Sequence, residues 1–367
     1  MIKLAIIGGF LGAGKTTLIF NLAKRYRTLG LKVGIVTNDQ GSGLVDTEFL
    51  KSEGFSVVEV DGGCFCCNFD LFTEKIEELV GINMPDIILA EPVGSCTDLI
   101  ATIFKPLLKE KVFIEEFAQH FAYAPMSIVV DPKRMNRVIM DAENSFPNEI
   151  NYLFRKQLEE ANIILLNKID LLSKEEVKEM TIYLKKHYPG TEIIPISAKK
   201  DSQVEQLSQL LLEEEITKTK TLEIDYPIYG AAEAYLGWLN ASGYVILEEE
   251  INLCEIVERF MRSCQQVFRA ERQEIAHLKV YAIGQADFLK ASLVSVEDDI
   301  DFNKKTEEPI KQFNLIVNAR VNIQPDKLKD TIEKLLQDTL KSYGATINHF
   351  KVESFAPGYP TPKYRMT

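Results

Sequence analysis

Short apolar runs and helical patterns alternate along the first 215 residues of the chain. The apolar runs predict seven strands, over residues 2–8, 32–38, 56–61, 86–91, 126–131, 162–167 and 192–197. Several are apolar almost throughout, as is typical of strands that helices cover on both faces. Helical patterns between them lie at Lys15–Leu29, Thr73–Val80, Lys133–Asp141, Glu149–Glu160, Lys174–His187 and Val204–Glu214. This alternation predicts an α/β fold with a doubly wound, mostly parallel sheet.

The pattern changes after residue 215. Residues 213–227 are charged and rich in threonine and end in a proline, which indicates a linker. Helical patterns then lie at 253–271 and from residue 324 onward, among strand patterns at 234–247, 277–283, 287–296, 313–322 and 346–355. We therefore expect a first domain over 1–215, a linker over 216–227 and a smaller α+β domain over 228–367.

Charge and cysteine content restrict the classes of function. The 54 acidic and 42 basic residues give a net charge of −12, which argues against broad binding to nucleic acids or anionic membranes. The apolar N-terminus has no cleavage site, and no stretch is long enough to span a bilayer. Six cysteines in 367 residues do not form a disulfide scaffold. We expect a cytoplasmic protein with reduced cysteines and with neither nucleic-acid nor membrane partners.

A phosphate-binding motif follows the first predicted strand. Residues 8–17 read GGFLGAGKTT, which contains Gly9-x-x-x-x-Gly14-Lys15-Thr16. In a P-loop, backbone N–H groups and the helix N-terminus bind phosphate oxygens. Lys15 would neutralise the β- and γ-phosphates, and the Thr16 hydroxyl would coordinate Mg²⁺. The predicted nucleotide-binding residues are Gly9, Gly12, Ala13, Gly14, Lys15, Thr16 and Thr17. The alternative is a glycine-rich turn without a ligand.

A second motif predicts which base is bound. Asn167-Lys168-Ile169-Asp170 ends an apolar strand, and the Asp170 carboxylate can accept both N–H donors on the edge of guanine. Lys168 would lie along the base, and Asn167 would connect this loop to the P-loop. Ser197-Ala198-Lys199 ends a later strand, where backbone amides can meet the guanine O6. The order of the motifs favours GTP and GDP over adenine nucleotides. The alternative is a polar turn in which Asp170 caps a helix.

Carboxylates at two further strand ends are candidates for hydrolysis. Glu91 ends the strand 86–91, where it can hold Mg²⁺ through water, and Gly94 can sense the γ-phosphate. Asp39 and Asp46 lie in a glycine-bearing loop that can act as a switch around Mg²⁺ and GTP. We predict Lys15, Glu91 and Asp39 as catalytic residues and Thr16 and Asp46 as Mg²⁺ ligands. Turn and capping roles are the alternative for Asp39 and Asp46. Since no glutamine is obviously placed to orient the attacking water, and Gln40 is a weak candidate, we expect slow hydrolysis without a partner.

Half of the cysteines lie within four positions, in the segment GGCFCC at residues 62–67. Thiolates select soft or borderline ions, and Gly62 and Gly63 help the loop to bend so that Cys64, Cys66 and Cys67 can face one ion. We predict a transition-metal site, with a redox switch and a structural role as alternatives. Cys96 can approach this cluster or the nucleotide, although a role in a turn is the simpler interpretation.

These motifs resemble the CobW family of P-loop GTPases, in a wider group with the nickel-insertion GTPases of hydrogenase and urease. GGFLGAGKTTL, NDQGSGLVD, GGCFCC, EPVG and NKID occur in the family's order. The resemblance implies a GTP-driven metallochaperone or cofactor-insertion protein whose three cysteines bind Zn²⁺ or Co²⁺. It also implies a client metalloenzyme or corrinoid protein and a nucleotide-dependent homodimer. The chain departs from the family at Ser42, where a carboxylate is usual, and it lacks a histidine-rich stretch.

Two other functions compete with this one. The first is a nucleotide-gated chaperone of a corrinoid-dependent enzyme that carries no metal itself. The second is a small-molecule kinase, which Asn167–Asp170 disfavours because most kinases use ATP. The C-terminal residues FAPGYPTPKYRM are rich in proline, aromatic and basic side chains. They predict an exposed segment that contacts a partner or the first domain, or else an ordinary ordered tail.

Overall fold

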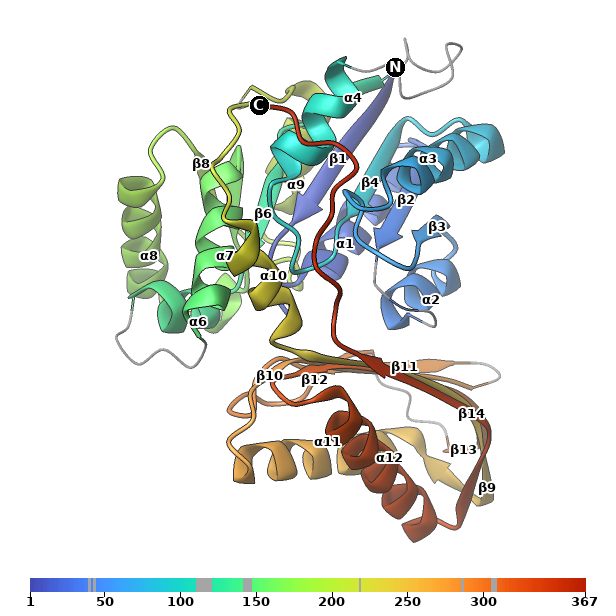
Figure 1. Ribbon diagram of the computed structural model, residues 1–367. Coiled ribbons are helices and arrows are strands. Elements are labelled where there is room, and N and C mark those ends of the chain that lie inside the picture. Colours follow the sequence, from blue (N-terminus) through green and yellow to red (C-terminus); the bar gives the residue numbers. More distant parts are fainter. Residues whose placement is uncertain are drawn as a thin grey trace. The chain divides into compact units, whose positions relative to one another are not determined.

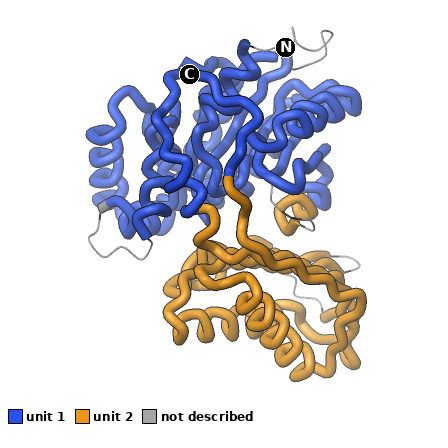
Figure 2. The backbone as a smooth tube through the Cα atoms, viewed as in Figure 1, with its two compact units in different colours: residues 1–40, 50–232, 360–367 blue, residues 41–49, 233–359 orange. Residues whose placement is uncertain are grey.

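A computed structural model describes residues 1–38, 41, 44–109, 121–140, 147–217, 219–284, 287–304 and 309–367. The chain divides into two compact units, shown in Figure 2. Unit 1 comprises residues 1–40, 50–232 and 360–367, and unit 2 comprises residues 41–49 and 233–359. Residues 216–227, which the sequence predicts to be a linker, belong to unit 1.

Unit 1 is built on one parallel sheet (Figure 1), with the strand order β3-β2-β4-β1-β6-β7-β8 and with β5 paired to β1. Every residue of the central strands β1, β2, β4, β6 and β7 is buried. Both faces of the sheet are therefore covered, which confirms the predicted α/β class. The strands are β1 Ile2–Gly8, β2 Val33–Asn38, β3 Ser56–Val60, β4 Ile87–Glu91, β5 Phe121–Tyr123, β6 Ser127–Val130, β7 Ile163–Leu166 and β8 Glu192–Pro195.

Helices connect these strands. The α-helices are α1 Lys15–Thr28, α2 Val45–Ser52, α3 Phe69–Asn83, α4 Lys105–Lys109, α6 Pro132–Met135, α7 Asn148–Glu160, α8 Lys174–His187, α9 Val204–Glu213 and α10 Tyr226–Ala234. The π-helices are η1 Ile100–Phe104 and η2 Asn136–Met140, and η3 Ile169–Leu171 is a 3₁₀-helix. Helix α8 begins with a capping box between Ser173 and Glu176. Helix α3 begins at Phe69, four residues before the predicted start, directly after the cysteine segment.

Unit 2 is an antiparallel sheet of order β12-β11-β10-β13-β9-β14, with helices α11 and α12 packed on its core. Phe260, Leu278 and Val317 belong to this core. The predicted α+β class is thereby confirmed. Its elements are β9 Gly237–Asn252, α11 Leu253–Ala270, β10 Ile275–Ile283, β11 Phe288–Leu293, β12 Asp301–Lys304, β13 Pro309–Val321, α12 Pro325–Ser342 and β14 Ala345–Phe355.

Two short segments belong to the unit that is distant in sequence. Residues 41–49, from the loop after β2, belong to unit 2, and the C-terminal residues 360–367 belong to unit 1. Both are shown by colour in Figure 2. Across the residues that the structure describes, none of the helices has the length and apolar character needed to cross a membrane.

Candidate functional site

The P-loop joins β1 to α1 in a conformation that depends on glycine. Gly9 and Gly14 have φ angles of 131° and 99°, which favour glycine. A Cβ atom on Gly9 would lie 2.2 Å from the Val129 carbonyl oxygen, so the loop packs directly on β6. Helix α1 starts at Lys15, and the N–H groups of a helix's first turn have no acceptor within the helix itself. The geometry therefore has the features of an anion site at a helix N-terminus.

Lys15, Thr16 and Glu91 meet at the end of the P-loop. The Thr16 hydroxyl donates a hydrogen bond to Glu91 Oε1 at 3.1 Å, and Lys15 Nζ lies 3.9 Å from the same oxygen. All three side chains are buried. A hydroxyl beside a carboxylate is an oxygen donor set that suits Mg²⁺. The structure thus brings together the predicted residues Lys15, Thr16 and Glu91, while their roles in binding and catalysis stay predictions.

Gly94 brings the loop after β4 against the P-loop. A Cβ atom on Gly94 would lie 2.9 Å from the backbone nitrogen of Leu11 and 2.7 Å from its side chain. A larger residue would therefore push the two loops apart. This close approach fits the predicted part of Gly94 in sensing the γ-phosphate.

The predicted contact between Asn167 and the P-loop is present. Asn167 Nδ2 donates to the Ala13 carbonyl at 2.8 Å, and Asn167 Oδ1 accepts from Ala198 N at 2.9 Å. Asn167 thus joins the P-loop, β7 and the segment Ser197–Lys199. Lys168 Nζ donates to the Gly12 carbonyl at 2.8 Å. These contacts hold the loop that would bind the base beside the loop that would bind the phosphates.

Asp170 and its neighbours form the candidate base site. The Ser197 hydroxyl donates to Asp170 Oδ1 at 2.5 Å, which fixes the orientation of the carboxylate. Asp131, directly after β6, has a carboxylate that lies 2.5 Å from Lys168 Nζ and also caps α6. Burial raises the pKa of Asp131, yet the Lys168 ammonium outweighs it and leaves the pKa below the usual value. Asp131 therefore holds Lys168 in place. In the sequence, the signal for this role is the position of Asp131 at the end of an apolar strand.

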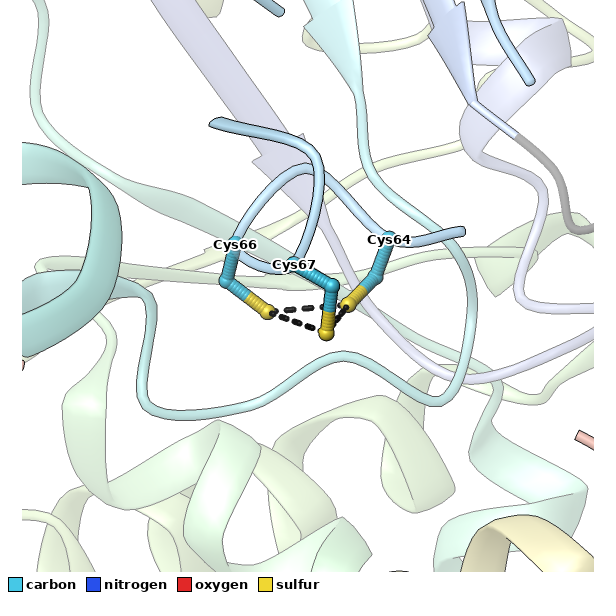
Figure 3. Close-up of side chains that lie close together, drawn as sticks. All are labelled: Cys64, Cys66 and Cys67. Carbon is cyan, nitrogen blue, oxygen red and sulfur yellow. Dashed lines mark hydrogen bonds between the residues drawn. The ribbon is translucent and has the colours of Figure 1, made fainter. Parts of the chain in front are cut away.

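The three clustered cysteines turn their sulfur atoms toward one another (Figure 3). The Sγ atom of Cys64 lies 2.9 Å from that of Cys66 and 3.0 Å from that of Cys67, and the latter two lie 4.0 Å apart. Zn–S bonds of about 2.3 Å in a tetrahedral site place sulfurs roughly 3.8 Å apart. Within the described ranges, these three form a group of potential ligand atoms that lie within 4.8 Å of one another. The predicted juxtaposition of the cysteines is confirmed.

The cluster stabilises negative charge on one of its sulfurs. Hydrogen bonds with Cys66 and Cys67 hold the pKa of the Cys64 thiol well below its usual range. The pKa of Cys66 is raised because of its bond to Cys64, and the same cause raises that of Cys67 to about 11. An ion that binds to all three sulfurs would displace the protons that the thiols still carry.

Asn38, the last residue of β2, holds the cysteine loop in place. Its Nδ2 donates to the carbonyls of Val60 at 2.8 Å and Gly63 at 2.7 Å. Its Oδ1 accepts from Phe65 N at 3.0 Å. Asn38 directly precedes the loop in which Asp39 was predicted to be a catalytic residue. Sequence reasoning did not give Asn38 this role, because the contact depends on β2 and β3 pairing side by side.

The C-terminal tail, residues 360–367, contacts the same loop within unit 1. Lys363 N donates to the Cys66 carbonyl at 2.9 Å, and the Thr361 backbone hydrogen-bonds with the Cys67 side chain. Lys363 Nζ lies 2.6 Å from both oxygens of Asp70, at the start of α3. Of the alternatives drawn from the sequence, contact with the first domain is the one that the structure supports.

The predicted switch residues have different outcomes. Asp39, Gln40 and Ser42 lie outside the described residues, so the catalytic assignment of Asp39 stays a prediction. The Asp46 carboxylate forms ion pairs with Lys279 Nζ and with Lys290 Nζ, the latter at 3.1 Å, all within unit 2. These two ammonium groups outweigh burial and lower the pKa of Asp46. Since Asp46 already has two cationic partners, its assignment as a Mg²⁺ ligand also stays a prediction.

Comparisons with known proteins place these features in a family. A model of the CobW/HypB/UreG nucleotide-binding domain matches residues 3–195. The zinc chaperone CobW of a Sinorhizobium species is 30% identical over 191 residues, which are 48% of this chain and 53% of that protein. The zinc chaperone YeiR of Escherichia coli (strain K12) is 30% identical over 182 residues, 48% of this chain and 49% of that protein. The chain spans about half the length of the curated relatives it matches.

Among solved structures, the Zn(II)-bound YjiA GTPase from E. coli is similar to 91% of this chain, with 98% of that chain covered. Its TM-score is 0.39 and its sequence identity is 15%. The P-loop, the cysteine segment, Glu91 and Asn167–Asp170 all lie within the residues that the family model matches. Because these residues make up more than half of the 367-residue chain, the protein belongs to the CobW/HypB/UreG family of P-loop GTPases.

Proposed function

We propose that this protein is a GTP-hydrolysing metallochaperone that binds a transition metal through Cys64, Cys66 and Cys67 and transfers it to a client metalloenzyme. The observation that carries the proposal is the convergence of three sulfurs within 4.0 Å on a loop tied to the end of β2. Two matched relatives are named zinc chaperones, which favours zinc over cobalt as the ion. The cargo would be carried in the cytoplasm, where thiols stay reduced.

The nucleotide in this proposal is GTP. The P-loop residues from Gly9 to Thr17 would bind the phosphates, and Lys15 would stabilise the charge that develops on the γ-phosphate. The Asp170 carboxylate would accept the two N–H groups of guanine while Lys168 supports the base. Mg²⁺, when bound, would neutralise phosphate charge, and Thr16 and Glu91 are the residues that would hold it. Hydrolysis would be slow without a partner, since the motifs contain no obvious glutamine to orient water and Gln40 is a weak candidate for this role.

The link between GTP and the metal would pass through Asn38. This side chain ends the strand that leads into the switch loop, and it makes three hydrogen bonds to the cysteine loop or its flanks. A switch loop that orders around the γ-phosphate would therefore hold the sulfurs in a binding arrangement. Hydrolysis would release that constraint and lower the affinity for the ion. By reciprocity, metal binding would favour the GTP state.

A direct test compares the affinity for Zn²⁺ in the presence of GDP and of a non-hydrolysable GTP analogue, by competition with a chromophoric chelator under anaerobic conditions. We expect tighter binding with the analogue, because the nucleotide and the ion favour the same loop arrangement. Equal affinity in both states would refute the coupling. The variant Asp170→Asn serves as control, because it should lose the response to the GTP analogue while its cysteines still bind zinc.

The variant Cys64→Ser/Cys66→Ser distinguishes this proposal from a nucleotide-gated chaperone of a corrinoid-dependent enzyme that carries no metal. We expect it to bind guanine nucleotides normally and to lose zinc binding. If the wild-type protein binds no metal in either nucleotide state, the metallochaperone proposal fails. The chaperone without metal would then be the better account.

A further inference from the structure

The three clustered cysteines leave one position of a tetrahedral metal site unfilled. Structural and transport sites for zinc take four ligands, and three sulfurs supply only three of them. Water, a ligand from the client or a residue that the fold brings to the same place can supply the fourth ligand. Given the proposed function, we ask which of the described side chains completes the metal site.

Cys96 is a thiol that the fold places beside this cluster. It follows Gly94 by two residues on the loop after β4, and it is 2% exposed. Its side chain hydrogen-bonds with that of Cys64. Thirty residues of sequence separate Cys96 from Cys66, so their proximity arises from the parallel sheet. Cys96 is therefore an extension of the cysteine cluster from a second loop.

Hydrogen bonds from α7 hold the loop that carries Cys96. Gln157 of α7, which is 1% exposed, donates through Nε2 to the carbonyls of Gly94 at 3.0 Å and Cys96 at 2.8 Å. Cys96 N donates to the Val93 carbonyl at 2.9 Å, which closes the turn. These bonds fix the backbone of the turn that carries the Cys96 thiol.

The carboxylate in this loop has other partners. Asp98 follows Cys96 by two residues, and its Oδ2 accepts hydrogen bonds from the Tyr226 hydroxyl at 2.9 Å and from Arg365 Nε at 2.7 Å. Using Asp98 as a ligand would break both bonds and leave Arg365 without its anion. Thiolate is also the ligand type that matches the other three. Cys96 is therefore a better fourth ligand than Asp98.

We propose that Cys96 is the fourth ligand, so that one ion is held jointly by the cysteine loop and by the loop after β4. In the absence of the ion, the Cys96 sulfur lies outside the group of three whose ligand atoms are all within 4.8 Å of one another. Binding must therefore draw it closer to at least one of the other three sulfurs. Four thiolates around Zn²⁺ form a closed site, and the thiol protons leave to solvent.

This arrangement gives the nucleotide a direct connection to the ion. The loop with Cys96 begins at Glu91, whose carboxylate accepts the hydrogen bond from the Thr16 hydroxyl, and it passes Gly94, which packs on Leu11. A shift of Gly94 on loss of the γ-phosphate would move Cys96 as part of the same turn. One sulfur would then leave the ion, and a site with three thiolates would be open to a ligand from the client.

The experiment counts sulfur ligands. In the presence of a non-hydrolysable GTP analogue, the wild-type protein and the variants Cys96→Ser and Cys254→Ser are loaded anaerobically with one equivalent of Co²⁺, and the sulfur-to-cobalt charge-transfer absorption is recorded. This absorption grows with the number of thiolate ligands, so we expect Cys96→Ser to lose about a quarter of it. Cys254, in α11 of unit 2, is a matched control whose replacement should leave the spectrum unchanged.

Zinc affinity provides the second readout. Loss of a residue that hydrogen-bonds to a metal ligand typically weakens metal binding 10- to 100-fold. Cys96→Ser would remove a ligand itself, so we expect its affinity for Zn²⁺ to fall by more than about 100-fold. X-ray absorption on zinc-loaded wild-type protein with the same GTP analogue should give four sulfur neighbours. Three sulfurs in the wild type, or identical cobalt spectra for wild type and Cys96→Ser, would overturn the assignment of Cys96 and leave the metallochaperone proposal standing. Absence of metal binding by the wild type would overturn the proposed function itself.

Discussion

Replacing Asn38 by alanine tests whether the end of β2 controls the metal site. The substitution removes three hydrogen bonds, from Asn38 Nδ2 to the carbonyls of Val60 and Gly63 and from Phe65 N to Asn38 Oδ1. Asn38 is 8% exposed, so the backbone groups that lose their hydrogen-bond partner are poorly placed to bond with bulk water. Each such bond contributes about 1 kcal/mol, and the three together contribute about 3 kcal/mol to the order of the loop.

The predicted effect on metal binding follows from this value. If most of the 3 kcal/mol is needed to hold the sulfurs in place, the Kd for Zn²⁺ should rise by roughly 100-fold, since each 1.4 kcal/mol corresponds to a factor of ten. The assay is chelator competition without nucleotide, so that an altered switch loop does not contribute. Thermal unfolding measured in parallel shows whether the fold has survived.

A matched control separates a local effect from general weakening. Asn83→Ala removes a hydrogen bond from Asn83 Nδ2 to the Ser56 hydroxyl, at 3.0 Å, elsewhere in unit 1. It should lower the stability slightly and leave the Kd for Zn²⁺ unchanged. An Asn38→Ala protein that binds Zn²⁺ as tightly as the wild type would refute the reasoning, because the three bonds would then have no part in positioning the sulfurs.

Three further predictions concern nucleotide binding and pH. Asp170→Asn should weaken GTP binding by several powers of ten and favour xanthosine triphosphate, because an amide no longer accepts two N–H groups. Competition between the two nucleotides measures this preference. An unchanged preference would contradict guanine recognition by Asp170. Gly14→Ala should abolish binding of a fluorescent GTP analogue, because Gly14 has a φ of 99° and an added Cβ atom would lie 2.4 Å from Asn167 Nδ2. Retained binding would show that the P-loop adapts to the added methyl group. Burial raises the pKa of Glu160 from 4.5 to about 8. The folded state therefore keeps a proton that the unfolded state releases above pH 4.5, and the stability from this group is lost as pH rises to 8, by up to about 1.4 kcal/mol per pH unit. Glu160→Gln should flatten this slope in urea unfolding series at pH 5, 6.5 and 8, and an unchanged slope would assign the dependence to other groups.

The pattern along the chain was sufficient for the fold class and for the phosphate loop. Strands such as Ile163–Leu166 are buried on both faces, and burial on both faces requires a continuous apolar run that is visible in the sequence. The P-loop is equally local, since Gly9, Gly14 and Lys15 act through backbone conformations set within eight residues. The three cysteines lie within four positions, so their convergence also follows from local chain geometry.

The contacts among loops depended on the tertiary structure. Asn38 contacts the cysteine loop because β2 and β3 pair in parallel, and Cys96 reaches Cys64 from a loop that follows another strand. Residues 41–49 and 360–367 each belong to the unit that is distant in sequence. No local pattern encodes these partners, because they result from which strands become neighbours and which buried groups find hydrogen bonds there. The sequence by itself determined a P-loop fold with a thiol cluster, and packing decided which elements connect the two.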